Sequence, residues 1–298
     1  ENLKTVVGNL KLYKPNYLLL VPAFVESFYA KIWSTIKEQK KDKAFKFLMK
    51  ASNLMMKCGI DKRKELFGSV HKVFGGELQK IVCGGAPIRK EIADFFETIG
   101  IGLLNGYGIT ECSPLVSVNR DYFNDPATVG VKLPCIEVKL DDINEDGNGE
   151  ICVQGPTVML GYYKNEEATA EAIVDGWFHT GDLGKLDKDG FIYITGRIKN
   201  LIILSNGKNV SPEELETLIG RIPGVVECLV SEEDNKLVAE IYPDEEFRTT
   251  QSDIQAYFNE QIDQLNDTLP PYKAIAKIII RDTEFVKTTT KKIKRRYK

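Results

Sequence analysis

The segment that decides the fold is Leu78-Gln-Lys-Ile-Val-Cys-Gly-Gly-Ala-Pro87, together with the residues after it up to Gly108. Its apolar run ends at a glycine pair, which predicts a short buried strand and a tight turn. The next apolar residues share one helical face, and Gly100 stands where such a helix would end. A second strand is expected at Ile101–Leu104, before Asn-Gly-Tyr-Gly. Strand, helix and strand in this order predict a parallel sheet of an α/β fold, with ligands at the carboxyl ends of its strands. The helical face consists of Ile88, Ile92, Phe95, Phe96 and Ile99.

The regions on either side differ in character. Residues 1 to about 75 look helical, because apolar residues recur every four positions from Phe24 to Ile36. Residues 126 to 196 are rich in β-branched residues and turns, which predicts a small, mostly antiparallel β-rich region. The composition changes again at Arg197–Asn200. The region after this break is predicted to be a compact α+β domain, with a helix at Pro212–Ile219, a hairpin turn at Asp234-Asn235 and a helix near Asp253–Leu265.

Composition excludes several classes of function. The 298 residues contain 40 Lys and Arg against 43 Asp and Glu, so bulk positive charge cannot drive nucleic-acid binding. Only two histidines are present, which excludes a multi-histidine metal site and a zinc hydrolase. The six scattered cysteines form no CxxC pair, as is typical of a reduced, cytoplasmic protein. The apolar stretch Leu18–Val25 contains Pro22 and is too short to span a membrane. The sequence shows no secretory signal and begins with Glu1 rather than Met, so we expect a fragment of a longer protein.

Two stretches carry residues suited to nucleotide chemistry. Gly84 and Gly85 follow a strand and would let a flat ligand approach the backbone, although a tight turn needs glycine in any case. In Asn105–Glu111, Tyr107 offers an aromatic face, Thr110 a hydroxyl for phosphate and Glu111 an oxygen ligand for Mg²⁺. The pattern Gly106-x-Gly108 lacks the third glycine of a dinucleotide fingerprint, because position 111 is Glu.

Four further patterns have structural interpretations, and three of them also have a functional one. Asp182 could accept hydrogen bonds from ribose hydroxyls, with an Asx-turn as the favoured alternative when it is considered alone, and Arg197 suits phosphate or ribose oxygens. The acidic run Asp142–Gly147 resembles the start of an EF-hand loop but has Val153 at the twelfth position, so a hairpin turn is expected. Ser211-Pro212-Glu213-Glu214 predicts a capping box. The basic residues of 287–298 could form a plain frayed tail or contact nucleic acid or acidic lipid.

Taken in order, these segments resemble the AMP-forming acyl-CoA synthetase family, which includes luciferases and peptide-synthetase adenylation domains. The sequences of Val73–Leu78 and Leu204–Pro212 are similar to those of the long-chain fatty acid branch of this family. The resemblance implies the C-terminal half of such an enzyme: part of a parallel-sheet adenylation domain in residues 1–198 (α/β in 1–120, a β-rich subdomain in 121–198), followed by an α+β lid domain in 199–298. Six blocks carry it: Gly84–Pro87, Tyr107–Glu111, Gly155–Tyr163, Trp177–Asp182, Gly196–Glu216 and Thr288–Arg295.

The resemblance also implies residue roles. Tyr107 would stack on adenine beside Gly108, Thr110 would contact the α-phosphate, and Glu111 would hold Mg²⁺. Asp182 would bind the ribose with help from Arg197, and Lys199 would be the hinge of the lid domain. Lys292 would be the adenylating lysine, although Lys291 stands where the family usually has Gly and leaves the choice of lysine open. The remaining implied residues are Gly84, Gly85 and Ala86 in the adenine and acyl pocket, and Ser205, Asn206, Gly207 and Lys208 on the coenzyme A face.

The implied activity is that of an AMP-forming acid–thiol ligase. A fatty carboxylate and ATP would give acyl-AMP and pyrophosphate, and coenzyme A would then displace AMP. The family's Ser/Thr/Gly-rich phosphate loop has no counterpart in residues 1–83, so we expect the isolated chain to be inactive. Three alternatives stay open: activation of an aryl or amino acid, a non-catalytic adenylate-binding module, and, more remotely, a nucleic-acid binder acting through the basic tail. Peripheral membrane contact of the parent enzyme is a further interaction that we expect.

Overall fold

The computed structural model describes residues 3–85, 88–288 and 293–295, which form two compact units. The first unit comprises the chain up to Asp141, together with Ile151–Thr180 and Lys185–Ile194. The second comprises Asp142–Glu150, Gly181–Gly184 and the chain from Thr195 onward. Helices and strands alternate along the chain, and the fold is mixed α/β, as the sequence predicts. The division into domains at residues 198 and 199 stays a prediction.

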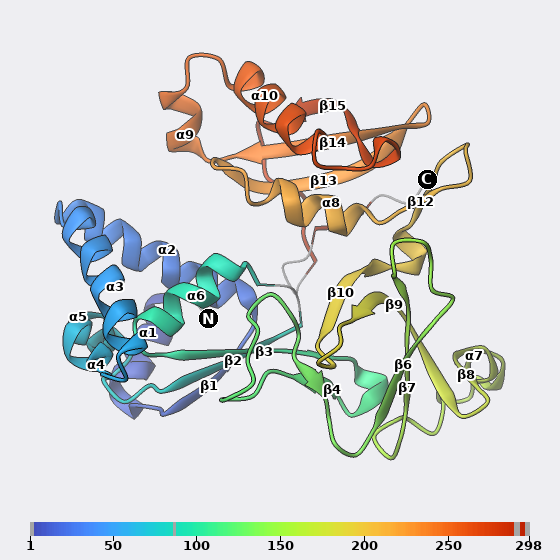
Figure 1. Cartoon of the computed structure of the whole chain (residues 1–298), viewed down its shortest axis with the longest axis horizontal. Coiled ribbons are helices and arrows are strands. Elements are labelled where there is room, and N and C mark those ends of the chain that lie inside the picture. Colours follow the sequence, from blue (N-terminus) through green and yellow to red (C-terminus); the bar gives the residue numbers. More distant parts are fainter. Residues whose placement is uncertain (1–2, 86–87, 289–292, 296–298) are drawn as a thin grey trace. The chain divides into compact units, whose positions relative to one another are not determined.

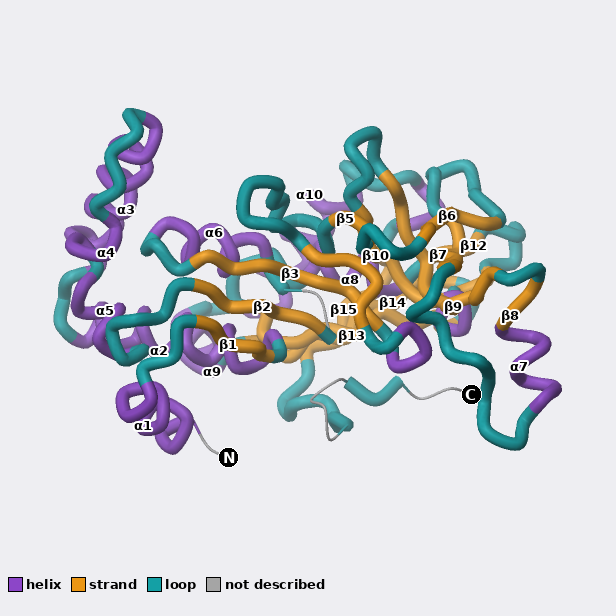
Figure 2. Tube along the Cα trace, turned by 90° about the horizontal axis from the view of Figure 1, so that it is seen from below, coloured by secondary structure: helices purple, strands orange, loops and turns teal. Residues whose placement is uncertain are grey.

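A five-stranded sheet organises the first unit. Its strand order is β1-β2-β3-β4-β5. The pairs β1–β2 and β2–β3 are parallel, as the strand–helix–strand pattern predicts, while β4 and β5 add antiparallel pairs. Figure 2 shows β1, β2 and β3 side by side. The bounds are β1 Tyr17–Leu20, β2 Lys80–Gly84, β3 Gly102–Gly108, β4 Leu115–Val118 and β5 Val131–Lys132.

The helices on one side of this sheet contact one another through aromatic rings. Figure 1 shows α2, α3 and α6 on the same side of β1, β2 and β3. Phe95 of α6 is central to the core, because its ring packs edge-to-face on Tyr29 at 5.0 Å and on Phe96 at 5.4 Å. Burial of each such ring stabilises the unit by about 1.5–3 kcal/mol. The helices are α1 Leu3–Tyr13, α2 Pro22–Glu38, α3 Asp42–Lys57, α4 Arg63–Leu66, α5 Gly68–Val73, α6 Lys90–Thr98, the 3₁₀ turn η1 Thr110–Cys112 and α7 Glu166–Ala172.

One of the two histidines belongs to this core. His71 is buried, and its Nε2 donates a hydrogen bond to the carbonyl of Ile99 at 2.8 Å, just past the end of α6. Helix α6 begins at Lys90, with Arg89 as its N-cap residue, so Ile88, a residue of the expected helical face, lies before the helix. Pro87 lies outside the described residues.

A second sheet has the strand order β10-β9-β7-β6, with β8 paired to β9. The acidic run after β6 is a hairpin turn, as predicted, because Asn144 Oδ1 accepts hydrogen bonds from the backbone N–H groups of Asp146 and Asn148. Residues of this sheet are divided between the two units. The bounds are β6 Glu137–Asp141, β7 Gly149–Gln154, β8 Ile173–Val174, β9 Trp177–Leu186 and β10 Ile192–Arg197.

The second unit has its own sheet and core. Strand β14 pairs antiparallel with β13 and parallel with β15, and Phe258 of α10 is fully buried against them. Asp234 and Asn235 form the predicted hairpin turn with φ of 51° and 61°. The bounds are η2 Ile198–Asn200, β11 Ile202–Ile203, β12 Asn209–Val210, α8 Pro212–Ile219, β13 Val225–Glu233, β14 Lys236–Pro243, α9 Glu245–Thr250, α10 Ile254–Asn266, η3 Pro271–Lys273 and β15 Ile275–Ile280.

Ser211 and Glu214 do not form the hydrogen bonds of the predicted capping box, so this prediction is wrong. Ser211 is the N-cap residue of α8, with Pro212 in the first turn, but its side chain makes no capping bond. Its hydroxyl donates to the carbonyl of Thr195 at 2.6 Å instead. Glu214 does not turn back to the helix end, because it pairs with the buried Lys273 at 2.9 Å. Tertiary partners therefore compete successfully with the local motif.

The close approach of β4 and β5 yields a stability prediction. Gly130 has φ of 81°, and a Cβ atom there would overlap the backbone of Val118 and Asn119. Gly190 has φ of 84° in the same unit but open space around it. We expect Gly190→Ala to lower the free energy of unfolding by about 1 kcal/mol, and Gly130→Ala to lower it by about 3 kcal/mol or more. Urea unfolding midpoints measure both, and equal losses would contradict the described contact.

Candidate functional site

The carboxyl ends of β2 and β3 bring the first two sequence blocks to one edge of the sheet. Gly84, the last residue of β2, pairs with Gly106 of β3, and a Cβ on Gly84 would stand 3.3 Å from the Gly106 carbonyl oxygen. Gly85 follows with φ of 88° and nothing around its missing side chain. A hollow of about 350 Å³ lies here, lined in part by Gly84, Gly85, Gly108 and Leu115. The predicted turn is therefore open to a flat ligand on one side, while Ala86 lies outside the described residues.

The second block lies partly on a strand rather than in a turn. Strand β3 continues to Gly108, four residues beyond the predicted end, because β4 pairs with its last residues. A Cβ on Gly108 would overlap the carbonyl of Pro114, so this glycine is required by the β3–β4 packing. Tyr107 is only 9% exposed and packs in a hydrophobic cluster with Cys112 and Val116. Its ring is thus held rigidly, with little of its surface open.

Thr110 and Glu111 occupy the 3₁₀ turn η1 that comes after β3. Thr110 is exposed and Glu111 is half-buried. The Tyr162 hydroxyl donates a hydrogen bond to Glu111 Oε1 at 3.1 Å, and the Met159 N–H donates to the Glu111 carbonyl at 2.7 Å. Burial and this carboxylate raise the pKa of Tyr162, so the phenol stays a donor. Tyr162 lies in one of the family blocks but has no role predicted from the sequence, because Glu111 is 51 residues away along the chain.

In the second unit, Asp182 forms an ion pair with Arg197. Asp182 is 3% exposed, and its Oδ1 lies 2.7 Å from Arg197 Nε, whose side chain is 44% exposed. Asp182 lies inside the ten-residue strand β9. The tight turn comes earlier, at Asp175 and Gly176, which have φ of 51° and 78°. The pair holds one carboxylate in a fixed orientation with a partly open guanidinium beside it.

The predicted hinge and coenzyme A face also lie in the second unit. Lys199 is exposed in the 3₁₀ turn η2. The segment from Ser205 to Lys208 forms the turn between β11 and β12. The Ser205 N–H donates to Asn235 Oδ1 at 2.6 Å, Lys208 N–H donates to Asn206 Oδ1 at 3.0 Å, and Gly207 has φ of 77°. Lys208 Nζ pairs with Glu145 at 2.6 Å, so this turn is anchored at both ends.

Lys291 and Lys292 lie outside the described residues, but the segment around them is anchored. Arg295 Nη2 lies 2.5 Å from Glu216 Oε2 and 3.4 Å from Glu213 Oε1 on α8. Lys287 forms an ion pair with Glu227 and a β-bridge with Ile293. The chain on both sides of the lysine pair is therefore attached to the second unit.

Comparisons with known proteins identify the family. A profile described as "AMP-binding enzyme" matches residues 2–163, and one described as "AMP-binding enzyme C-terminal domain" matches residues 199–297. The chain belongs to the AMP-binding enzyme family. The resemblance carried by the sequence blocks is thereby confirmed.

This chain is similar to curated relatives that carry names of one kind. It is 33% identical over 245 residues to a long-chain-fatty-acid–CoA ligase of Mycobacterium bovis, covering 77% of the chain and 40% of the relative. It is 44% identical over 168 residues to a ligase of the same name from Salmonella typhimurium, covering 54% of the chain and 28% of the relative. The chain thus spans less than half the length of the curated relatives it matches.

Solved structures of the family share the fold. The o-succinylbenzoate CoA synthetase of Bacillus subtilis, in complex with its acyl-adenylate intermediate, matches with a TM-score of 0.71 at 22% identity, covering 98% of this chain and 52% of that one. A benzoate CoA ligase of Burkholderia xenovorans matches with a TM-score of 0.70 at 20% identity, with 98% and 53% covered. At these identities the likeness establishes the α/β fold alone. Within the described residues, no helix has the length and apolarity needed to cross a bilayer.

The anchor of the C-terminal segment yields a pH-dependence prediction. Burial raises the pKa of the Glu216 carboxyl from its ordinary value of 4.5 to about 7, although nearby Arg295 acts in the opposite direction. Between these pH values the folded chain binds up to one proton more than the unfolded chain. The free energy of unfolding should therefore fall as pH rises from 4.5 to 7, by up to about 1.4 kcal/mol per pH unit.

Glu216→Gln should remove this contribution, and the exposed Glu260→Gln on α10 of the same unit should retain it. Urea unfolding at a series of pH values measures the slopes. Identical slopes for wild type and Glu216→Gln would show that Glu216 keeps its ordinary titration in the folded chain.

Proposed function

We propose that this chain is the C-terminal part of a longer AMP-forming acid–thiol ligase that joins a long-chain fatty acid to coenzyme A. This proposal is supported by the two family profiles and by the names of the curated relatives. The sequences of Val73–Leu78 and Leu204–Pro212, which resemble the long-chain fatty acid branch of the family, support it as well. The single observation that carries the adenylate chemistry is the buried Asp182 carboxylate paired with Arg197. A carboxylate fixed in this way can accept hydrogen bonds from both hydroxyls of a ribose.

The proposed adenine and phosphate contacts come from the first unit. Gly84 and Gly85 leave room for a planar base at the sheet edge. The family resemblance gives Tyr107 the stacking role, which its 9% exposed side chain would fill through the small part of the ring that is open. The exposed hydroxyl of Thr110 would donate to the α-phosphate. Glu111 offers hard carboxylate oxygens, the ligand type that Mg²⁺ prefers, and Tyr162 orients that carboxylate. Mg²⁺, when bound, would neutralise phosphate charge.

The proposed reaction has two steps. A fatty carboxylate oxygen attacks the α-phosphorus of ATP, the bond to pyrophosphate breaks, and acyl-AMP forms. The coenzyme A thiolate then attacks the acyl carbonyl carbon, and AMP leaves. Since the first nucleophile is already ionised, the step needs positioning and charge neutralisation rather than a general base, and the Lys292 ammonium would supply part of that positive charge. Before the second step, motion of the chain about Lys199 would withdraw Lys292 from the reacting groups and bring the turn Ser205–Lys208 to them instead.

The substrate class can be tested on the full-length protein. Pyrophosphate release is measured with a panel of long-chain fatty, short-chain, aryl and amino acids. We expect the long-chain fatty acids to give the highest kcat/KM. A clear preference for aryl acids, which several structural neighbours use according to their names, would replace the fatty-acid proposal by the aryl alternative.

The isolated chain has a narrower expected role. Its sequence contains no phosphate loop in residues 1–83, so we propose that the chain alone binds adenylates without catalysing their formation. Turnover of ATP and fatty acid by the purified chain would contradict this part of the proposal.

Lys292 is expected to act in one half-reaction only. In the full-length protein, Lys292→Ala should abolish acyl-AMP formation, because the ammonium is needed only while charge develops on the phosphates. Thioester formation from supplied acyl-AMP should be preserved. The two half-reactions are measured separately by pyrophosphate release and by thioester production, with Lys291→Ala as the matched control. Equal loss in both half-reactions, or a larger loss in Lys291→Ala, would refute the assignment of Lys292.

A further inference from the structure

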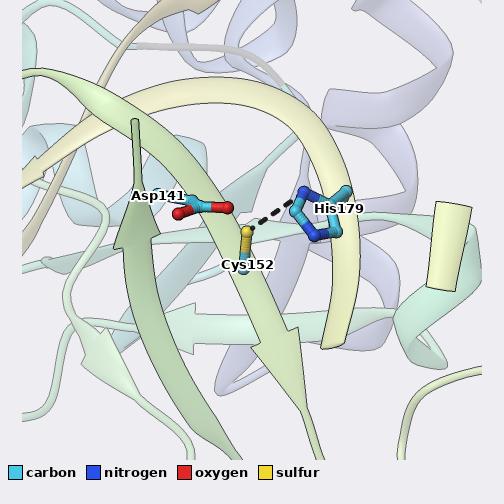
Figure 3. A group of neighbouring side chains, drawn as sticks. All are labelled: Asp141, Cys152 and His179. Carbon is cyan, nitrogen blue, oxygen red and sulfur yellow. Dashed lines mark hydrogen bonds between the residues drawn. The ribbon is translucent and has the colours of Figure 1, made fainter. Parts of the chain in front are cut away.

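Three side chains with metal-binding atoms meet on neighbouring strands of the second sheet, all within the first unit. Asp141 ends β6, Cys152 lies on β7 and His179 lies on β9, and the sheet order β9-β7-β6 makes these strands direct neighbours. Figure 3 shows the Cys152 thiol between the Asp141 carboxylate and the His179 ring, which lean toward it from the flanking strands. None of the three side chains has a part in the proposed adenylate chemistry.

The spacing of these atoms matches a metal centre. Cys152 Sγ lies 3.5 Å from His179 Nδ1. A tetrahedral zinc ion with Zn–S of about 2.3 Å and Zn–N of about 2.05 Å places sulfur and nitrogen about 3.6 Å apart. One carboxylate oxygen of Asp141 lies within 4.8 Å of both atoms, so a small rotation of an exposed side chain completes a three-ligand set. Strand spacing of about 4.8 Å explains the arrangement: the short Cys side chain occupies the centre, and the longer Asp and His side chains reach in.

The burial of the three side chains favours a bound ion over a Cys–His contact that is sealed inside the core. Cys152 is fully buried, His179 is half-buried and Asp141 is exposed. The set is therefore open on the Asp141 side, where an ion can enter and a water molecule can take a fourth position. A thiolate and an imidazole together select borderline transition ions, rather than Mg²⁺ or Ca²⁺, which prefer oxygen ligands.

We propose that Asp141, Cys152 and His179 form a binding site for a divalent ion of the zinc class, separate from the proposed Mg²⁺ ligand Glu111. Binding replaces the thiol proton of Cys152 by the metal, and the proton is released to solvent. No electron transfer is involved. The bound ion joins β6, β7 and β9, so occupancy stabilises the folded chain.

Cobalt(II) titration of the reduced, metal-free chain tests the site. Co²⁺ takes the same ligands as zinc, and a Co–thiolate bond gives a charge-transfer band in the near ultraviolet. We expect one equivalent of Co²⁺ to produce this band together with tetrahedral visible bands, and one equivalent of Zn²⁺ to abolish them. Zn²⁺ should also raise the thermal unfolding midpoint.

Variants assign the ligands. Cys152→Ser should lose the charge-transfer band, and His179→Asn and Asp141→Asn should weaken Co²⁺ binding at least about tenfold, since even loss of an outer-shell partner costs that much. Asp141 is exposed, so Asp141→Asn remains informative if a substitution of the buried Cys152 fails to fold. The neighbouring exposed Asp142→Asn is its matched control and should bind as wild type. The double variant Cys58→Ser/Cys135→Ser removes the two exposed thiols and should also bind as wild type.

Two outcomes would overturn the proposal. The first is the absence of a thiolate band at one equivalent of Co²⁺ in the wild type. The second is a band that persists in Cys152→Ser or disappears in Cys58→Ser/Cys135→Ser, which would place the metal on other thiols. In either case the cluster would be a cross-strand Cys–His contact only.

Discussion

The parallel pairing of β2 with β3, with Gly84 opposite Gly106, is the constraint on which the first unit depends. Because the two strands run in the same direction, both glycine-rich blocks end at one edge of the sheet. The lack of side chains at Gly84 and Gly85 leaves space at this edge, whereas the lack of one at Gly106 lets β4 approach, because a Cβ there would stand 3.0 Å from the Ser117 carbonyl oxygen. Any residue with a Cβ at Gly84 would press on the Gly106 carbonyl and fill the place proposed for a planar base.

Buried polar groups then fix the course of the chain after β3. The Asn105 side chain donates to the Thr128 carbonyl at 3.1 Å, and the Asn119 side chain donates to the carbonyls of Asn105 and Thr128. Buried amides require partners, so this network determines how the loop that ends at Gly130 enters the sheet.

In the second unit, buried ion pairs fix the course of the chain. Lys273 is 4% exposed and lies 2.8 Å from Asp146 and 2.9 Å from Glu214, which joins the β6–β7 turn to α8.

Local patterns could be predicted where the sequence period or a turn motif determined the outcome. The α2 stripe, the parallel β2–β3 pair, the hairpin at Asp234-Asn235 and helix α10 result from periodicity and positive-φ residues. The capping box failed because Thr195 and Lys273, distant in sequence, bind Ser211 and Glu214. The length of β3 was underestimated because β4, seven residues later, extends it.

The candidate site shows the same limit. Block order in the sequence was enough to name the family, yet the hydrogen bond of Tyr162 to Glu111 depends on how a distant loop folds back. The grouping of Asp141, Cys152 and His179 depends on the order of β6, β7 and β9 in the sheet, which no local pattern specifies. Lys292, identified by its block alone, stays a prediction.

The most direct test of the proposed adenylate site is calorimetric titration of this chain with a non-hydrolysable fatty acyl-adenylate mimic, with Asp182→Ala as the comparison. We predict saturable binding by the wild-type chain that the substitution removes, because the ribose hydroxyls lose their carboxylate acceptor. Asp182→Glu, which keeps a carboxylate near Arg197, should retain part of the affinity. Binding of equal strength by wild type and Asp182→Ala, or no binding by the wild type, would show that this chain does not carry the adenylate contacts proposed for it.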